Sequence, residues 1–410
     1  MSMMKGADVE RLRQLAKQLE QQGLQITRIR DELNGPVDQI TWHGADSQQF
    51  KNDWKNAHRA ALNNASSTLT TAAALLRRNA DAQEATSNEY DSTASVSGIA
   101  NAQDHTGTAR ENSWLDMTDK ERQGLSIEEL RRFGSDTELS PTIRDQANRI
   151  YLEKYMGQLK DPGGIFWWEN DQYEDKMRAL KQIKESLEGH PDAQLISFDP
   201  DAPDSIRVAI SLGPVDRSDH IAVYVQGMNS RTDSADGLSH PISDMAALRA
   251  QAGSDTAMVV WMEYDAPQGS EVFSRGFADA GATQLADFLN NIHHHNPGAQ
   301  LDLLGHSYGS TVAGLAVRQT DVVNDLIIIG SPGIGTDDLN DLRIKGDLWV
   351  GKAQWDVTAN SGVYGADPSG IEGARSFDTG GGQNPFNAHD SYLVNGSTSQ
   401  RSIADILRRH

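Results

Sequence analysis

Hydrophobic residues follow two different spacings along the chain. Up to about residue 190 they recur every three or four positions, as on one face of an α-helix. Beyond that point they gather in short runs of apolar and β-branched residues, bounded by Asp-Pro, Gly-Pro or glycine-rich segments. The first spacing predicts helices and the second predicts buried strands, so we expect an all-α part followed by a part with a β-sheet.

The first 90 residues carry two amphipathic patterns in succession. Val9–Ile40 predicts one long helix that ends near Gly35-Pro36 or just past it. Asp46 and Gln49 form a D-x-x-Q capping box that opens a second helix. Trp42-His43-Gly44 lies between the two patterns and predicts a turn. We therefore expect residues 1–90 to form an antiparallel helical hairpin.

With Trp42 and Gly44 in this turn, residues 1–90 resemble the WXG proteins, helical hairpins exported by type VII secretion systems. The resemblance implies a WXG-like partner or self-association through the hairpin. It also implies secretion, or attachment to the cell envelope, by a route other than Sec, with a cytoplasmic location as the alternative. The family's export tag has an acidic residue four positions after a tyrosine, whereas Ala94 follows Tyr90 at that distance. A hairpin used only for dimerisation or docking is the other interpretation.

Two segments separate the hairpin from the strand-rich part. Residues 91–113 are rich in Ser, Thr, Ala and Asn without clear periodicity, which is typical of a linker. Residues 114–190 return to a helical pattern, with capping boxes at Thr118 with Glu121 and at Ser126 with Glu129. We interpret this second segment as a helical connection.

Strand and helix patterns alternate through residues 191–410. This alternation predicts an α/β domain with a mostly parallel sheet covered on both faces. The predicted strands are Gln194–Phe198, Ser205–Leu212, His220–Val225, Ala257–Met262, Leu301–Leu304, Leu326–Ile329 and Asp347–Ala353.

The strand Leu301–Leu304 runs directly into Gly305-His306-Ser307-Tyr308-Gly309, and a helical pattern, Ser310–Val317, follows. Strand, G-x-S-x-G and helix together are the signature of a nucleophile elbow. A serine on such a sharp turn needs small neighbours two positions before and after it, and Gly305 and Gly309 supply them. Ser307 is therefore the predicted nucleophile.

A serine nucleophile needs a base, and after an elbow the partners follow in the order acid, then histidine. His389 and His410 are the histidines beyond Ser307. His410 ends the sequence, whereas His389 lies in a loop before the last helical pattern. We predict His389 as the base.

The acid that orients the base has several candidates. Asp356 follows the strand Asp347–Ala353 directly, where a carboxylate can hold the imidazole in one tautomer. Asp367, Asp378 and Asp390 compete with it. Asp367 lies in a glycine-rich loop, and Asp390 is too near the base in sequence to orient it easily. Asp356 is the prediction, with the other three left open.

An oxyanion needs two N–H donors in such a site. The first is expected from Tyr308, which begins the helix after the elbow. The second is expected from the loop after His220–Val225, through Met228 or Asn229.

Five motifs make residues 191–410 resemble the actinobacterial α/β-hydrolases of unassigned substrate that are often fused to WXG-like segments. The resemblance implies a Ser-Asp-His hydrolase. We expect a carboxylesterase or lipase-like enzyme acting on a small-molecule or lipid-like ester; an amidase or peptidase, or a non-catalytic interaction protein on this scaffold, are the alternatives. The motifs are V-Q-G-M at Val225–Met228, G-H-S-Y-G-S at Gly305–Ser310, G-S-P-G at Gly330–Gly333, W-D at Trp355–Asp356 and A-H-D-S-Y at Ala388–Tyr392.

Composition narrows the remaining possibilities. The formal net charge of −21 disfavours nucleic acid as a partner, and the absence of cysteine excludes disulfides and a thiol nucleophile. Adjacent histidines at His293–His295 point in different directions on a helix, so we expect no metal site there. We also expect no cofactor. The charged N-terminus does not resemble a Sec signal peptide, and no apolar run is long enough for a transmembrane helix.

Overall fold

The contacts of the chain divide it into two compact units, residues 1–102 and residues 103–410. No helix in the described ranges combines the length and the apolar character needed to cross a bilayer. The computed structural model describes residues 9–39, 106–159, 167–203, 205–268, 275–380 and 387–409, together with the single positions 51, 54, 59 and 62.

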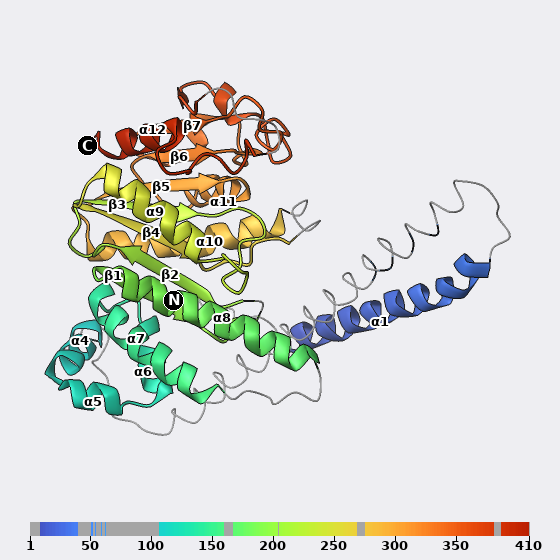
Figure 1. Ribbon diagram of the computed structural model, residues 1–410, viewed down its shortest axis with the longest axis horizontal. Helices are drawn as coiled ribbons and strands as arrows, with labels where there is room; N and C mark the ends of the chain where they lie inside the picture. Colours follow the sequence, from blue (N-terminus) through green and yellow to red (C-terminus); the bar gives the residue numbers. More distant parts are fainter. Residues whose placement is uncertain are drawn as a thin grey trace. The chain divides into compact units, whose positions relative to one another are not determined.

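The first unit contains the long helix α1 (Val9–Gln39), which is 31 residues long (Figure 1). Its extent agrees with the predicted helix, and it ends just past Gly35-Pro36. The predicted turn at Trp42-His43-Gly44 and nearly all of the second predicted helix lie outside the described residues. The hairpin therefore stays a prediction.

Eight strands form one sheet in the described part of residues 103–410, in the order β1-β2-β4-β3-β5-β6-β7-β8. β2 is antiparallel to both of its neighbours, and all other neighbours pair in parallel. The mostly parallel α/β sheet is therefore confirmed. The strands are β1 (Ala193–Asp199), β2 (Arg207–Leu212), β3 (His220–Val225), β4 (Thr256–Met262), β5 (Gln300–His306), β6 (Leu326–Ile329), β7 (Leu348–Gly351) and β8 (Arg375–Phe377).

All seven predicted strands are present, but β8 was not predicted. It has three residues, two of which are exposed, so it carries no apolar run that the sequence pattern could reveal. It extends the sheet by pairing with β7, with Val350 opposite Ser376.

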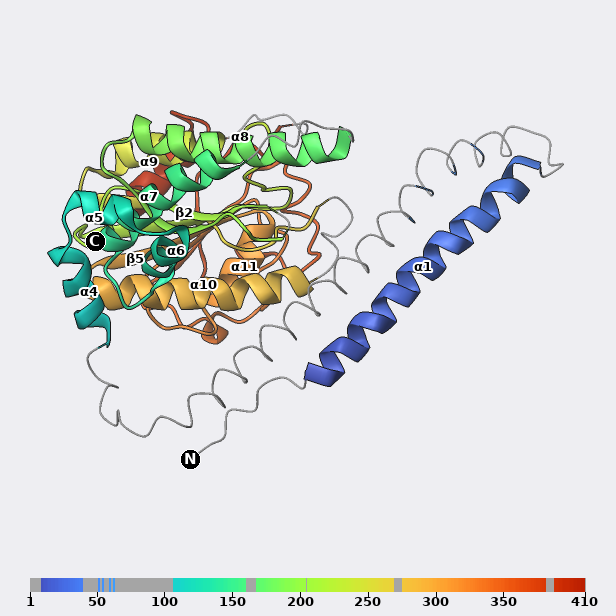
Figure 2. The same ribbon diagram turned by 90° about the horizontal axis from the view of Figure 1, so that it is seen from below.

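Helices cover both faces of the sheet (Figure 2). Each face has its own hydrophobic core, because successive strand residues point to opposite sides. One core includes α7 (Pro141–Gln158), α8 (Trp167–Gly189), α9 (Ser239–Ala252) and α12 (Thr398–Leu407). The other includes α10 (Gly276–His295) and α11 (Tyr308–Ala316).

The predicted connecting segment, residues 114–190, is helical as expected. The capping boxes of α5 (Asp119–Gly124) and α6 (Ile127–Ser135) both form. The linker prediction for 91–113 is wrong over its last residues, because α4 (Thr106–Asp116) begins inside it. Trp114 anchors the end of α4, because it is fully buried and its ring packs at a tilt against Phe133 of α6, with the ring centroids 4.9 Å apart.

The helical segment belongs to the same compact unit as the sheet. β1 is an edge strand, so its backbone would otherwise be open to another chain. Asp145 of α7 accepts a hydrogen bond from the Leu195 N–H at 2.6 Å, and Asn148 donates to the Leu195 carbonyl at 2.9 Å. α7 therefore covers this edge, and the sheet with its helices forms one body from residue 103 onward.

The carboxyl ends of the central strands lie side by side. Val225 of β3 pairs with Gly305 of β5, His306 pairs with Ile329 of β6, and Ile329 pairs with Gly351 of β7. The loops after these strands therefore meet at one edge of the sheet, which is where ligands bind in open α/β sheets.

Candidate active site

Ser307 lies on the tight turn between β5 and α11. Its backbone has φ 54° and ψ −129°, a region that costs a non-glycine residue about 1–3 kcal/mol. A Cβ on Gly305 would lie 2.7 Å from the Ser310 Cα, and one on Gly309 would lie 2.3 Å from the Val225 carbonyl oxygen. Only glycine fits at either position, so the two glycines allow the strained turn that presents the Ser307 hydroxyl.

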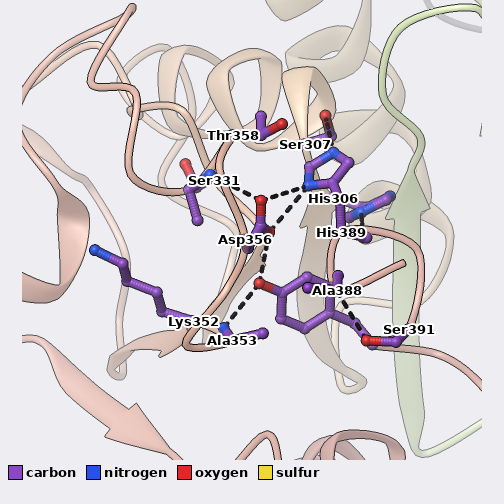
Figure 3. A network of polar contacts seen from close by, with 12 residues as sticks. His306, Ser307, Ser331, Lys352, Ala353, Asp356, Thr358, Ala388, His389 and Ser391 are labelled. Atoms are coloured by element: carbon purple, nitrogen blue, oxygen red, sulfur yellow. Dashed lines mark hydrogen bonds and ion pairs between the residues drawn. The ribbon is translucent and has the colours of Figure 1, made fainter. Parts of the chain in front are cut away.

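Three predicted residues form one hydrogen-bonded chain (Figure 3). His389 Nε2 lies 2.8 Å from Ser307 Oγ. On the other side of the ring, His389 Nδ1 lies 2.9 Å from Asp356 Oδ2 and 3.0 Å from Oδ1. The nearby carboxylate favours the tautomer with the proton on Nδ1, which leaves Nε2 to accept the serine proton.

Asp356 is completely buried, and every contact it makes favours the ionised form. The Tyr392 hydroxyl donates to Oδ2 at 2.7 Å, and the Ala359 N–H donates to Oδ1 at 3.0 Å. Burial raises the pKa of this carboxyl, but these hydrogen bonds and the one from His389 outweigh burial and hold the pKa below its usual value. The carboxylate therefore stays charged where it can stabilise an imidazolium.

The competing carboxylates point elsewhere. Asp367 forms an ion pair with Lys352, and its side chain caps a 3₁₀ turn by accepting from the Ser369 N–H. Asp378 accepts from the Gly380 N–H. Asp390 follows His389 in the chain and lines the cleft, but the contacts of the His389 Nδ1 are to Asp356. Among the described residues, the structure brings Asp356 alone of the four proposed acids to the imidazole.

His306 supports the ring of His389 and was not predicted to take part. Its Nε2 hydrogen-bonds the His389 carbonyl oxygen at 2.9 Å, and the two ring centroids are 4.9 Å apart. Burial lowers the pKa of His306 to about 4, and the neighbouring His389 adds to this effect. A neutral His306 therefore holds the loop of His389 by its backbone. Its place inside the elbow motif was visible in the sequence, but its contact was not.

The other histidines weighed from the sequence are not part of this hydrogen-bonded set in the described residues. His410 falls outside the described residues. His293–His295 form the last turn of α10, where His295 Nε2 hydrogen-bonds the Thr137 carbonyl at 2.8 Å. No group of three potential metal ligands occurs among the described residues.

The three backbone N–H groups predicted to bind the oxyanion differ in whether they are available to donate a hydrogen bond to it. Tyr308 is the first residue of α11, and the first N–H groups of a helix point out of its N-terminus toward the serine. The prediction for Asn229 is wrong, because its N–H donates to the Pro267 carbonyl at 3.0 Å. Met228 lines the cleft and stays the predicted second donor. Gly227 lets this loop approach, since a Cβ there would lie 2.7 Å from Ser307 Cβ.

A cleft with a volume of about 580 Å³ opens above Ser307 and His389. Part of its wall is apolar and solvent-facing, with Val357 exposed by 73% and Val363 by 49%. Two buried polar atoms of lining residues, Gln226 Nε2 and the Tyr364 hydroxyl, have no hydrogen-bond partner in the described part of the chain. The cleft therefore offers both apolar contact and hydrogen bonds to a ligand.

Residues 201–365 match the family described as alpha/beta hydrolase. The fold is that of an α/β-hydrolase. The matched residues include Ser307 and Asp356, while His389 lies beyond them. Since the match covers the central strands and the elbow, it agrees with the fold class predicted from the alternating pattern.

Relatives and solved structures with similarity to the chain were also found. Uncharacterized protein Rv0963c of Mycobacterium tuberculosis is 28% identical over 240 residues, which are 53% of this chain and 88% of that protein. Uncharacterized protein Rv2079 of the same species is 25% identical over 363 residues, 72% of this chain and 55% of that protein. An esterase of Pyrobaculum calidifontis is 15% identical with a TM-score of 0.35, over 63% of this chain and 97% of that one. Carboxyl esterase 2 of Tuber melanosporum is 13% identical with a TM-score of 0.36, over 53% of this chain and 85% of that one.

Proposed function

We propose that this α/β-hydrolase is a serine esterase that cleaves carboxylic esters through an acyl-enzyme intermediate. The observation that carries the proposal is the chain of hydrogen bonds from Ser307 through His389 to Asp356. A solvated loop histidine has no reason to lie 2.8 Å from a strained serine and 2.9 Å from a buried carboxylate.

In the first half of the reaction, Ser307 Oγ attacks the ester carbonyl carbon and His389 Nε2 takes the hydroxyl proton. The carbonyl oxygen gains negative charge, which the Tyr308 and Met228 N–H groups stabilise. The bond between the carbonyl carbon and the alcohol oxygen then breaks. His389 returns its proton to that oxygen, so the alcohol leaves neutral and the acyl group stays on Ser307.

In the second half, a water molecule takes the place of the alcohol. His389 removes one proton from the water as its oxygen attacks the acyl carbon. The bond to Ser307 Oγ breaks, the serine regains its proton from the imidazole, and the carboxylic acid leaves. Asp356 keeps its charge throughout, holding the ring orientation and stabilising the imidazolium.

A panel of p-nitrophenyl esters of increasing acyl length tests this proposal. We expect the wild-type protein to hydrolyse the short esters, and Ser307→Ala to lose turnover while remaining folded. Asp356→Asn should lower kcat by roughly a thousandfold or more, because the wrong tautomer of His389 is then favoured. Asp367→Asn is the matched control, since Asp367 pairs with Lys352 instead.

The outcomes separate the alternatives. Loss of activity in Asp367→Asn with retention in Asp356→Asn would mean that the acid is misassigned. Turnover of p-nitroanilides at rates equal to the esters would identify an amidase or peptidase. If the protein is folded but inactive on every ester and amide, the remaining interpretation is a non-catalytic interaction protein that uses the hydrolase fold as a scaffold.

We further propose that residues 1–90 act as an export module of the type VII kind and engage a WXG-like partner or a second copy of the chain. The length of α1 supports this proposal, because it is the length that one arm of a WXG-type hairpin needs. Secretion or association with the cell envelope would follow. Analytical ultracentrifugation of the purified chain distinguishes self-association from a need for a separate partner.

A further inference from the structure

The cleft has a polar corner that the proposed chemistry does not use. The first turns of α9 place His240 and Asp244 in the cleft wall, with His240 Nδ1 and Asp244 Oδ2 4.0 Å apart. Asp390, next to the base in sequence, lines the cleft too. Two carboxylates alone would form only a solvated acidic cluster. Whether a ligand is expected therefore depends on the other polar groups of this corner.

Tyr224 lies in this corner. It is only 4% exposed and lines the cleft from the carboxyl end of β3. Its pKa is raised, first by burial and then by the charges of Asp244 and Asp390, which places both carboxylates within electrostatic reach of the ring hydroxyl. No hydrogen bond joins that hydroxyl to another residue in the ranges the structure describes, and Tyr224 lies in the wall of the cleft.

Gln226 adds a second unused donor, since its buried Nε2 also lacks a partner among the described residues. A buried donor left unpaired costs about 1–3 kcal/mol, so such groups are rare unless something binds them. The buried Gln226 amide therefore calls for a ligand that accepts hydrogen bonds, and the Tyr224 hydroxyl can donate to the same ligand. Asp244 and Asp390 call for one that donates them.

The corner adjoins the catalytic base, because Asp390 follows His389 directly in the chain and both residues line the cleft. His389 delivers the proton to the leaving oxygen. Its ring packs against that of His306, which in turn lies 6.0 Å from the Tyr392 ring. Tyr392 and Tyr224 belong to the core under α9 and α12, whereas Tyr308 and Tyr364 belong to the core on the opposite face. The corner next to His389 is thus open to an alcohol that this residue protonates, whereas the unpaired Tyr364 hydroxyl belongs to the core on the other face.

We propose that Tyr224, Gln226, His240, Asp244 and Asp390 form a subsite for the leaving alcohol, and that this alcohol is rich in hydroxyl groups, as in glycerol or a sugar. The proposal rests on the esterase function proposed above. A cationic alcohol would satisfy the two carboxylates but would offer nothing to the donors of Tyr224 and Gln226. A hydroxyl group both donates and accepts, so a polyol can satisfy all of them.

Four butyrate esters with one acyl group and different alcohols test the subsite: methyl butyrate, 1-monobutyrylglycerol, 6-O-butyrylglucose and butyrylcholine. We expect kcat/KM of the wild-type protein for the glycerol or glucose ester to exceed that for the methyl ester by about tenfold or more, the equivalent of one additional hydrogen bond. Tyr224→Phe and Asp244→Asn should each lower that ratio about tenfold, mainly through KM. Asp287→Asn, an exposed carboxylate change on α10 across the sheet, should leave the ratio unchanged.

A wild-type protein without preference for either polyol ester would overturn the subsite, as would a ratio that neither variant lowers. A preference for butyrylcholine would replace the polyol with a cation and would equally refute it. If Tyr224→Phe does not fold, Asp244→Asn decides alone. Absence of turnover on all four esters would refute the esterase function itself, a result distinct from turnover without selectivity.

Discussion

The Tyr392 hydroxyl donates a hydrogen bond to Asp356 Oδ2 at 2.7 Å and accepts one from the Ala353 N–H at 2.9 Å. The tyrosine therefore joins the strand end after β7 to the carboxylate that faces His389. It touches no reacting atom, so it is a positioning residue. Its contact spans 36 residues of sequence.

Tyr392→Phe should reduce kcat by roughly tenfold and shift the acid limb of the kcat/KM profile to higher pH. With one hydrogen-bond donor fewer, the Asp356 carboxylate stabilises the protonated imidazole of His389 more strongly, so a higher pH is needed to obtain the neutral base. The change also leaves the buried Ala353 N–H without its acceptor, which should cost about 1–3 kcal/mol of unfolding free energy. The pH–rate profile is the deciding measurement, because a purely structural role would not shift it.

Tyr155→Phe is the matched control for that experiment. It removes a tyrosine hydroxyl that bonds Asp201 at 2.6 Å, far in sequence from the catalytic loops. The control should keep the pH profile of the wild-type protein. An unshifted acid limb in Tyr392→Phe would mean that the hydroxyl does not act through Asp356.

Gly330→Ala should damage catalysis more than stability. Gly330 has φ 60°, and a Cβ there would lie 3.0 Å from Asp356 Oδ2 and 3.1 Å from His389 Cε1. Displacing the pair by a fraction of an ångström should lower kcat by about 10- to 100-fold. Steady-state kinetics and thermal unfolding of the same preparation measure the two effects.

Gly396→Ala separates backbone strain from the clash. Gly396 also has a positive φ, 73°, but in the described part of the chain a Cβ there would meet no atom within 4 Å. Both variants should lose about 1 kcal/mol of stability through the left-handed conformation. Only Gly330→Ala should lose activity, and equal kinetics for the two would refute the close packing around the carboxylate.

Asp302 should make the fold more stable at mildly acidic than at alkaline pH. It is 2% exposed in β5, where burial raises its pKa to about 7. The folded state then binds a proton that the unfolded state releases, so stability is greatest below about pH 4 and declines as the pH rises through about 7. The unfolding free energy of the wild-type protein should fall across this range by about 2–4 kcal/mol from this group.

Asp302→Asn should remove most of that decline. An asparagine oxygen can still accept from the Asp325 N–H, which lies 3.0 Å from Asp302 Oδ1, and it carries no charge. Urea unfolding at several pH values compares the two proteins. A variant with the same slope as the wild type would mean that Asp302 is not the group that titrates.

Removal of residues 1–102 should leave hydrolysis of soluble esters within about twofold of the full chain. Every residue that lines the cleft lies at or beyond Tyr224, inside the second compact unit. Under the export proposal, the same deletion should abolish enzyme activity in the culture medium. Equal secretion of both forms would contradict the export role, and an inactive purified truncation would show that the hairpin supports the catalytic unit.

The parts of the site that the sequence predicts are those whose constraint is local. The elbow needs Gly305 and Gly309 beside Ser307, and all three fall within five consecutive residues. Asp356 could be proposed because it comes soon after the predicted strand Asp347–Ala353, although the observed β7 already ends at Gly351. These features depend on residues that are close together in the sequence, so a single sequence is enough to predict them.

The parts that the sequence missed depend on residues far apart in the chain. Tyr392 stands in the A-H-D-S-Y motif, but its bond to Asp356 exists only after the last loop folds back on β7. The Asn229 N–H could not be rejected as an oxyanion donor without its acceptor, Pro267. Asp244 enters the cleft from α9, and no spacing in the sequence relates it to the base.

Reaction of the full chain with a fluorophosphonate, read by intact mass and peptide mapping, tests the central claim most directly. The account predicts one adduct per chain, located on Ser307, with loss of ester hydrolysis in proportion to labelling. His389→Ala should slow the labelling by several powers of ten while Ser307 remains in place, because the serine then lacks its base. No adduct, or an adduct on another serine at the rate of esterase inactivation, would contradict it.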